Sequence, residues 1–62
     1  MFHMIKVTGR SNSGYSEAIK DTLNELKKDG KKIHFFNVIE QRGTFVKDEI
    51  EFQVVIEVAV EP

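Results

Sequence analysis

Polar and apolar residues alternate along residues 49–61, at the C-terminal end of the sequence. The residues on one side of this alternation are Ile50, Phe52, Val54, Ile56, Val58 and Val60. The residues on the other side are Glu51, Gln53, Val55, Glu57, Ala59 and Glu61. A period of two in β-branched and aromatic residues is typical of a strand with one buried face. At about 3.4 Å per residue, residues 50–60 would span roughly 37 Å.

The hydrophobic period changes to that of a helix between about Asn12 and Lys28. The stripe at three- and four-residue steps consists of Tyr15, Ala18, Ile19, Thr22, Leu23 and Leu26. We predict that Ser11 or Ser13 caps the helix N-terminus, because either hydroxyl can accept a hydrogen bond from the free amides of the first turn. Gly30 suits the left-handed position that follows a helix C-terminus.

Two further segments have the character of strands. Residues 2–8 alternate and are expected to end at Gly9, and residues 32–41 form a less regular segment. The two sides of a simple alternation in the second segment would carry Ile33, Phe35, Asn37 and Ile39 against His34, Phe36, Val38 and Glu40. Large apolar residues on both sides indicate a strand whose two faces both meet protein or ligand. Residues 42–48 are expected to form the connection to the last strand.

These elements predict an α+β fold with the chain order β-α-β-β and one domain over residues 1–62. The last two strands are expected to pair as a hairpin, and a right-handed crossover through the helix places the last strand between the other two. The predicted sheet is therefore three-stranded and antiparallel, in the order 1-3-2, with the longest strand in the centre. The predicted helix spans roughly 25 Å, so it covers one face of the sheet and falls short of the long strand. Nothing in the chain covers the other face, which carries Val55, Ala59 and either Phe35 or Phe36, and this indicates self-association.

Composition also favours oligomerisation as a source of stability. A chain of 62 residues buries only about 60% of its unfolded surface and is marginally stable alone. It has no cysteine, which excludes disulfides, and its histidines, His3 and His34, are too few for a zinc cluster. The net charge of −1 argues against a nucleic-acid partner, and no apolar run is long enough for a membrane span. The N-terminus lacks a signal-peptide pattern, so a cytoplasmic location is expected.

Four segments in register resemble the dodecins, a family of small flavin-binding proteins of bacteria and archaea. Residues 5–11, Ile-Lys-Val-Thr-Gly-Arg-Ser, are similar to the family's first strand, and residues 11–19 are similar to its helix start. Residues 35–43, Phe-Phe-Asn-Val-Ile-Glu-Gln-Arg-Gly, are similar to the family's Trp-Phe-Glu-Val-x-Glu-x-Arg-Gly. Residues 52–58, Phe-Gln-Val-Val-Ile-Glu-Val, are similar to its Tyr-Gln-Val-x-Leu-x-Val.

The resemblance implies a hollow homododecameric shell that stores flavins (riboflavin, FMN or FAD) in pairs between subunits. On this resemblance, Phe35 would stack on the isoalloxazine ring and Gln53 would hydrogen-bond its polar edge, while Arg42 would shape the site. Stacking favours a π-face, and an amide offers both a donor and an acceptor. No catalytic triad, nucleophilic cysteine or phosphate loop is recognisable, so we do not expect an enzyme.

The sequence departs from the family pattern at three positions. Phe35 stands in place of the stacking tryptophan, Asn37 in place of a glutamate, and Glu61 in place of a second arginine that many bacterial members carry. The alternative interpretations of the site residues are packing for Phe35, a solvated or interface amide for Gln53 and a salt-bridged turn residue for Arg42.

A second hypothesis is a dodecin-like shell that binds no flavin and holds cations, or an anionic ligand other than flavin. Glu51, Glu57 and Glu61 share one face and offer the oxygen ligands that Mg²⁺ and Ca²⁺ prefer. The simpler interpretation of these glutamates is a solvated face or ion pairs between subunits, so we predict no metal site. The lysine-rich segment 27–32 is a candidate for an anionic ligand, and its simpler interpretation is a solvated turn. A small oligomeric partner protein with no ligand is a third hypothesis.

Overall fold

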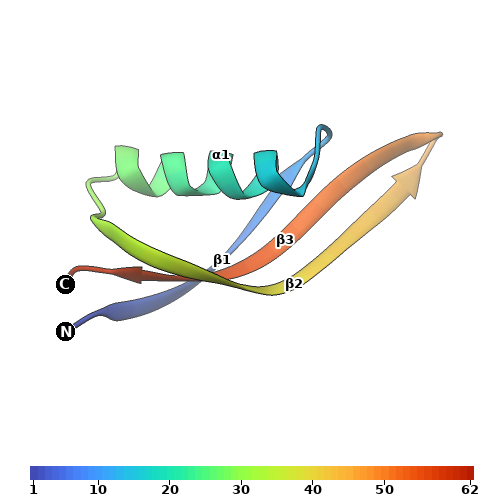
Figure 1. Cartoon of the computed structure of the whole chain (residues 1–62). Helices are drawn as coiled ribbons and strands as arrows, with labels where there is room; N and C mark the ends of the chain where they lie inside the picture. The colour runs from blue at the N-terminus through green and yellow to red at the C-terminus, as the bar shows by residue number, and fades with distance from the viewer.

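The computed structural model describes residues 1–62, and its elements follow the predicted order β-α-β-β (Figure 1). Their bounds are His3–Ser11 for strand β1, Tyr15–Lys28 for helix α1, Ile33–Val46 for strand β2 and Glu49–Val60 for strand β3. The sheet has the strand order β1-β3-β2, and β3 is antiparallel to both neighbours. The predicted fold class, strand order and pairing are therefore confirmed. Figure 1 shows α1 over one face of the sheet, while the β2–β3 hairpin continues beyond the N-terminal end of the helix.

The core lies between α1 and the face of β3 that the alternation predicted. Its fully or almost fully buried side chains are Ala18, Val54, Ile56, Val58 and Val60. The partly buried residues packed against them are Ile5, Val7, Tyr15, Ile19, Leu23, Leu26 and Ile33. The helical stripe and the buried face of the last strand are thus confirmed. Both patterns place apolar side chains at the contact between α1 and β3, where their burial stabilises the fold.

The N-terminal end of α1 differs from the prediction. The helix begins at Tyr15, and its N-cap residue is Gly14, which makes no side-chain cap hydrogen bond. The predicted caps Ser11 and Ser13 are wrong, because the Ser13 amide donates to Ser11 Oγ at 3.0 Å within the preceding loop. The hydroxyl therefore stabilises the turn out of β1 and leaves the helix amides without a side-chain partner.

The C-terminal end of α1 follows the prediction. Gly30 has a φ of 85°, in the left-handed region. The Gly30 amide donates to the Lys27 carbonyl and the Lys31 amide to the Leu26 carbonyl, both at 3.0 Å. This pair of bonds is a Schellman motif, which satisfies carbonyls that the last turn leaves free. The helix lacks the length and the apolar run that crossing a membrane requires.

Strand β1 continues past Gly9, so the predicted end of this strand is wrong. Gly9 pairs with Val54 in the middle of the sheet. A Cβ atom at this position would collide with the Thr22 side chain and would lie 2.8 Å from the Ala18 carbonyl oxygen. The glycine therefore permits close approach between the helix and the sheet, and its position inside a strand has this packing reason.

Strand β2 includes residues 42–46, which we predicted as part of the connection. Gly43 pairs with Phe52, and the ladder continues to Val46 opposite Glu49. The connection is a two-residue turn, in which Lys47 and Asp48 have φ values of 53° and 62°. Positive φ at both positions is the signature of a type I′ hairpin turn. Because β2 has 14 residues and β3 has 12, the prediction that the central strand is the longest is also wrong.

Two β-bulges in β2 change which side chains share a face. The register shifts between Ile33 and Phe35 and again between Val38 and Glu40. Residues that pair across an antiparallel ladder point to the same face, so each bulge moves the following residues to the opposite face. The α1 side of β2 carries Ile33, Phe36, Val38, Gln41, Gly43 and Phe45. The other side carries Phe35, Asn37, Glu40, Arg42, Thr44 and Val46. The simple alternation predicted for this strand is therefore wrong at each bulge.

The sheet face opposite α1, named the far face from here on, has no element of the chain over it. Its residues from β1 are Met4, Lys6, Thr8 and Arg10, and its residues from β3 are Glu51, Gln53, Val55, Glu57 and Ala59. The residues of β2 opposite α1 complete it. The predicted uncovered face is confirmed, although Ala59 on this face is fully buried.

Candidate functional site

A row of three polar side chains crosses the far face. Gln53 of β3 pairs with Arg10 of β1 on one side and with Arg42 of β2 on the other. These side chains and Thr8 line an open cavity of about 370 Å³. Neighbouring strands lie about 4.8 Å apart, so both guanidinium groups can reach a ligand that sits over Gln53.

Two hydrogen bonds orient the amide of Gln53. Arg42 Nε donates to Gln53 Oε1 at 2.9 Å, and Gln53 Nε2 donates to Glu51 Oε1 at 2.9 Å. Because arginine only donates and an ionised glutamate only accepts, both bonds fix the same orientation of the amide. One lone pair on Oε1 and one hydrogen on Nε2 remain unused. The amide can therefore accept one hydrogen bond from a ligand and donate another to it.

The row has more positive than negative charge. Arg42 Nη1 lies 4.0 Å from Glu40 Oε1, and both side chains are more than half exposed, so this ion pair is weak. Arg10 makes no side-chain hydrogen bond or ion pair with the rest of the chain. Planar guanidinium groups stack on aromatic rings and bind phosphate. The arrangement therefore suits a flat, polar-edged ligand, with or without a phosphate.

Phe35 lies on the same face, but far from this row along the sheet. It pairs with Ala59, which is six positions after Gln53 on β3. At about 3.4 Å per residue, the separation is roughly 20 Å. The ring of Phe35 packs edge-on against Phe2 with a centroid distance of 5.8 Å, and 45% of Phe35 is exposed. A three-ring ligand is shorter than this separation, so one chain cannot bring Phe35 and Gln53 to the same ring system.

The second bulge in β2 is what puts Phe35 and Arg42 on one face. These residues are seven positions apart, and an odd spacing in a regular strand points two side chains to opposite faces. The register shift between Val38 and Glu40 cancels this difference. Bulges often change the direction of a side chain beside a functional site. The structure thus brings Arg42 and Gln53 into contact and leaves Phe35 on their face but apart from them.

The acidic residue that departs from the family pattern, Glu61, lies at the Phe35 end of the sheet. Its Oε2 is 3.7 Å from Lys32 Nζ and its Oε1 is 3.5 Å from His34 Nε2. Its amide also donates to the Lys32 carbonyl at 3.0 Å. Glu61 therefore ties the end of the chain to the start of β2. Asn37 is opposite Glu57 on the far face, between Phe35 and the arginine row.

The three glutamates considered as cation ligands do not meet within one chain. No group of three or more His, Cys, Asp or Glu side chains is arranged to hold a metal ion. Glu51 accepts a hydrogen bond from Gln53, Glu57 is opposite Lys6, and Glu61 lies beside Lys32. A cation site would need carboxylates from several copies of the chain.

Arg10 is the site residue that the sequence analysis did not identify. We expected the first strand to end at Gly9, which left Arg10 in a loop. The pattern of Met4, Lys6 and Thr8, continued by one step, places Arg10 on their face. The sequence signal existed, and the turn-like composition after residue 8 concealed it.

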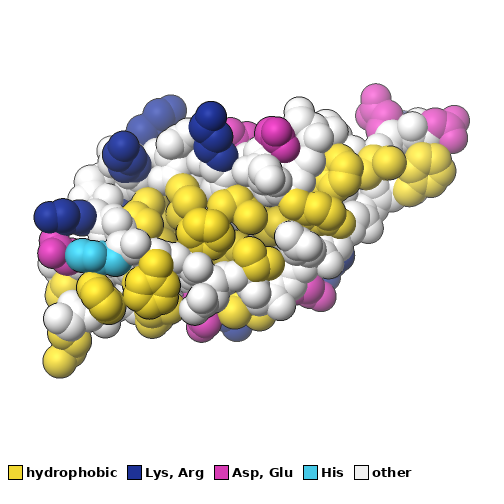
Figure 2. Space-filling model, in the orientation of Figure 1, with side chains coloured by type: hydrophobic (Ala, Val, Ile, Leu, Met, Phe, Trp, Pro, Cys, Tyr) yellow, Lys and Arg dark blue, Asp and Glu magenta, His cyan; other side chains and the backbone are white.

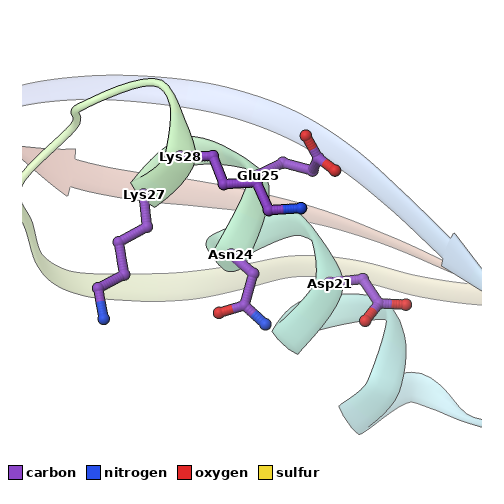
Figure 3. Close-up of a pocket in the computed structure, with 5 residues that line it drawn as sticks. All are labelled: Asp21, Asn24, Glu25, Lys27 and Lys28. Atoms are coloured by element: carbon purple, nitrogen blue, oxygen red, sulfur yellow. The ribbon is translucent and has the colours of Figure 1, made fainter.

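Two other cavities border α1. A polar one of about 600 Å³ is lined by Asp21, Asn24, Glu25, Lys27 and Lys28 (Figure 3). Figure 3 shows these side chains spreading away from the helix, with no common point toward which they converge. A second cavity of about 380 Å³ lies between α1 and β2 and includes Ile19, Leu23 and Phe36. Neither cavity brings two arginines together with an amide that hydrogen bonds already orient, as the row on the far face does.

Comparison with known proteins identifies relatives over the whole chain. The family model described as Dodecin matches residues 1–61. A structure of a Thermus thermophilus dodecin variant, in which phenylalanine replaces a tryptophan, is similar to this chain. It is 33% identical with a TM-score of 0.88, and the match covers 97% of this chain and 91% of that one. No curated protein matches this chain.

Two more distant structures share the fold. The dodecin from Streptomyces davaonensis is 24% identical with a TM-score of 0.88, and the match covers 97% of this chain and 90% of that one. The calcium dodecin from Mycobacterium tuberculosis, described as a calcium-chelating antigen, is 19% identical with a TM-score of 0.90. That match covers 100% of this chain and 90% of that one. At these identities the comparison supports the fold alone.

Proposed function

The chain belongs to the dodecin family, whose members are homo-oligomeric proteins that bind small ligands, and from this membership we propose that it stores flavins. The proposed ligand is riboflavin, FMN or FAD, held between subunits of a homododecamer in the cytoplasm. We propose no catalytic role. Gln53 recognises the polar edge of the isoalloxazine ring, Arg42 positions that glutamine, and Phe35 supplies a stacking surface.

The row of Arg10, Gln53 and Arg42 is the observation that carries this proposal. The Gln53 amide is fixed by Arg42 and Glu51, yet it keeps one free acceptor site and one free donor. The edge of an isoalloxazine ring alternates carbonyl oxygens with a ring N–H, so it complements both. An amide that is already oriented loses little conformational entropy when the ligand binds. Arg10 then adds a cation for ring stacking or for the phosphate of FMN.

The separation of about 20 Å between Phe35 and Gln53 fits a site formed by more than one subunit. In this proposal Phe35 of one subunit stacks on a flavin whose edge is bound by Gln53 of another. Phe35 is 45% exposed, so it has surface available for a ligand. Stacking on an aromatic face contributes about 0.5–1.5 kcal/mol beyond the burial of area.

Fluorescence titration tests the proposal. Purified protein is added to riboflavin, FMN and FAD, and we expect quenching of flavin fluorescence by stacking. Gln53→Ala is expected to weaken binding about tenfold, because it removes hydrogen bonds worth about 1.4 kcal/mol in total. Gln41→Ala is the matched control, because Gln41 belongs to the same hairpin but lies on the α1 side. This control should bind as the unmodified protein does.

Three outcomes would contradict the flavin proposal. One is the absence of quenching by all three flavins at concentrations of tens of micromolar. Another is full binding by Gln53→Ala, and the third is equal loss in Gln53→Ala and Gln41→Ala. Sedimentation velocity on the same samples measures the oligomer separately, so loss of the ligand site is distinguished from loss of assembly.

A shell that binds cations in place of flavin is the second candidate. It is favoured by the presence of Glu51 and Glu57 on the far face, which no other element of the chain covers. The calcium dodecin described above gives a precedent for such a ligand in this fold. Calorimetric titration with Ca²⁺ and Mg²⁺ tests it, and binding that is lost in Glu57→Gln but kept in Glu25→Gln would support it.

A further inference from the structure

A groove with an apolar floor runs between α1 and β2. Its volume is about 380 Å³, and its lining residues are Ser16, Ile19, Lys20, Leu23, Asn24 and Phe36. Phe36 is 38% exposed, and the neighbouring Val38 on the same side of β2 is 42% exposed. Figure 2 shows the apolar side chains as a continuous band below the helix, with lysines along the helix above it. The groove, defined by its six lining residues, is therefore an unpartnered apolar surface with a basic border.

The two flanks of α1 carry opposite charge. Lys20, Asn24 and Lys27 follow one another at four- and three-residue steps, so they share the flank that borders the groove. The flank turned away from the groove carries Glu17, Asp21 and Glu25 at four-residue steps, and Lys28 follows Glu25 at a three-residue step. Figure 3 shows Asn24 and Lys27 on one side of the helix, and on the other side Asp21 and Glu25, with Lys28 beside Glu25. The flank that borders the groove is therefore basic, whereas the other flank carries three acidic residues and one lysine.

The tip of the β2–β3 hairpin, residues 45–50, is the most exposed apolar part of the sheet. Phe45, Val46 and Ile50 are 69%, 62% and 49% exposed. Phe45 pairs with Ile50 on the α1 side, where the helix does not extend over them (Figure 1). The tip and its flank carry three acidic residues, Asp48 in the turn and Glu49 and Glu51 on the far face, against one basic residue, Lys47. The tip therefore projects apolar side chains and has net negative charge, whereas the groove is concave and apolar with a basic border.

We propose that the hairpin tip of one copy docks into the α1–β2 groove of a second copy. Phe45 and Ile50 cover the apolar floor, while Asp48 in the turn faces Lys20 and Lys27 on the border. Both surfaces lose exposed apolar area, and the opposite charges set the orientation. Tip and groove are different patches of the chain, so the contact is head-to-tail. Such contacts give a closed assembly when the rotation that relates successive copies completes a ring. The inference rests on self-association and not on flavin binding.

Charge reversal with a matched control tests the contact. Lys20→Glu/Lys27→Glu inverts the groove border, and Asp48→Lys/Glu49→Lys inverts the tip. Sedimentation velocity at low salt measures the subunit concentration below which the assembly dissociates into smaller species. For each variant this concentration is expected to be at least about tenfold higher than for the unmodified chain. The variant that carries all four changes restores opposite charges, and it is expected to assemble as the unmodified chain does. Asp21→Lys/Glu25→Lys changes the other flank of α1 and should leave assembly unchanged.

Cysteine crosslinking gives an independent readout, because the chain has no cysteine of its own. Lys20→Cys and Asp48→Cys alter exposed positions, so neither change disturbs the core. A protein with both changes is expected to form disulfides between chains on mild oxidation, with a ladder of multimers on a non-reducing gel. Each single variant should give far less of this product.

Two results would overturn the proposal. The first is a crosslinked sample that runs as monomer. The second is a set of charge variants in which the border, tip and control changes have equal effects, or in which the fourfold change fails to restore assembly. Circular dichroism on each variant separates loss of folding from loss of contact. Flavin quenching by the fourfold variant separates this interface from the ligand site.

Discussion

Gly9 is the residue at which the helix and the sheet approach most closely. We expect Gly9→Ala to destabilise the protein by about 1–3 kcal/mol, because the added methyl group overpacks this contact. It would collide with the Thr22 side chain and lie 2.8 Å from the Ala18 carbonyl oxygen. These two groups are joined by a hydrogen bond of 2.8 Å from Thr22 Oγ1, which restricts their movement apart. Urea unfolding at a fixed subunit concentration measures the change.

Gly43→Ala is the control for this prediction. Gly43 is also inside a strand, but a Cβ atom there would lie 3.4 Å from the Glu51 carbonyl oxygen, an ordinary contact. Alanine in place of a strand glycine reduces the entropy of the unfolded chain, so its effect should be neutral or stabilising by up to about 1 kcal/mol. Equal destabilisation by both changes would show that close packing against α1 is not the cause.

The role of Phe35 depends on whether its ring stacks or merely packs. Under the flavin proposal, Phe35→Trp should raise flavin affinity about fivefold, because a larger π-face contributes about 1 kcal/mol. Phe35→Leu keeps an apolar side chain and removes the π-face, so affinity should fall by a similar factor. Fluorescence titration measures both. Equal affinities for the Leu variant and the unmodified protein would assign Phe35 to packing.

Residue roles at the site could be predicted only in part from the sequence. The resemblance named Phe35, Arg42 and Gln53, but it could not show that Arg42 orients Gln53 or that Phe35 lies roughly 20 Å away. Contacts of this kind depend on strand register, which a single sequence does not specify. Arg10 was missed for another reason, because the turn-like composition after residue 8 concealed the continuation of β1 that pairs Arg10 with Gln53.

At the scale of elements, long regular periods were predictive and local interruptions were not. The alternation of β3 and the stripe of α1 each repeat several times, and the structure confirms both. In β2 the sequence already showed large apolar residues on both sides of a simple alternation. The physical cause is the pair of bulges, because the shift after Ile33 moves Phe36 and Val38 to the α1 side and Phe35 to the far face. An irregular alternation was therefore evidence for bulges, but it could not locate them.

The turn between β2 and β3 offers a prediction about an element boundary. Lys47 has a φ of 53°, which is unfavourable for lysine and acceptable for asparagine. We expect Lys47→Asn to stabilise the protein by about 0.5–1 kcal/mol, because asparagine adopts the left-handed conformation at a lower cost. Lys31→Asn is the control, since it removes the same charge at a position without positive φ. A higher midpoint of urea unfolding in the control as well would assign the gain to charge and not to the turn.

At the scale of the whole molecule, the subunit is extended for its length. Its radius of gyration is 12.4 Å and its extents are 44 × 21 × 13 Å. A compact domain of this length would have a radius of gyration of about 10.5 Å. The largest fully buried side chains are Ile56, Val54 and Val58. A core this small, with an uncovered far face and a projecting hairpin, gives a lone subunit little stability.

Assembly should therefore supply much of the stability of the fold. The stability should then increase with subunit concentration. By mass action, raising the subunit concentration 100-fold stabilises an associating fold by up to about 2.7 kcal/mol. For a domain of this size, that change raises the melting temperature by about 10 °C or more. Differential scanning calorimetry across this range, with sedimentation velocity on the same samples, tests the expectation. A melting temperature independent of concentration, together with a folded species of 7.1 kDa, would show that the monomer is sufficient. The far face and the hairpin tip would then need no partner copy for folding, and the proposed contact between copies would lose its energetic basis.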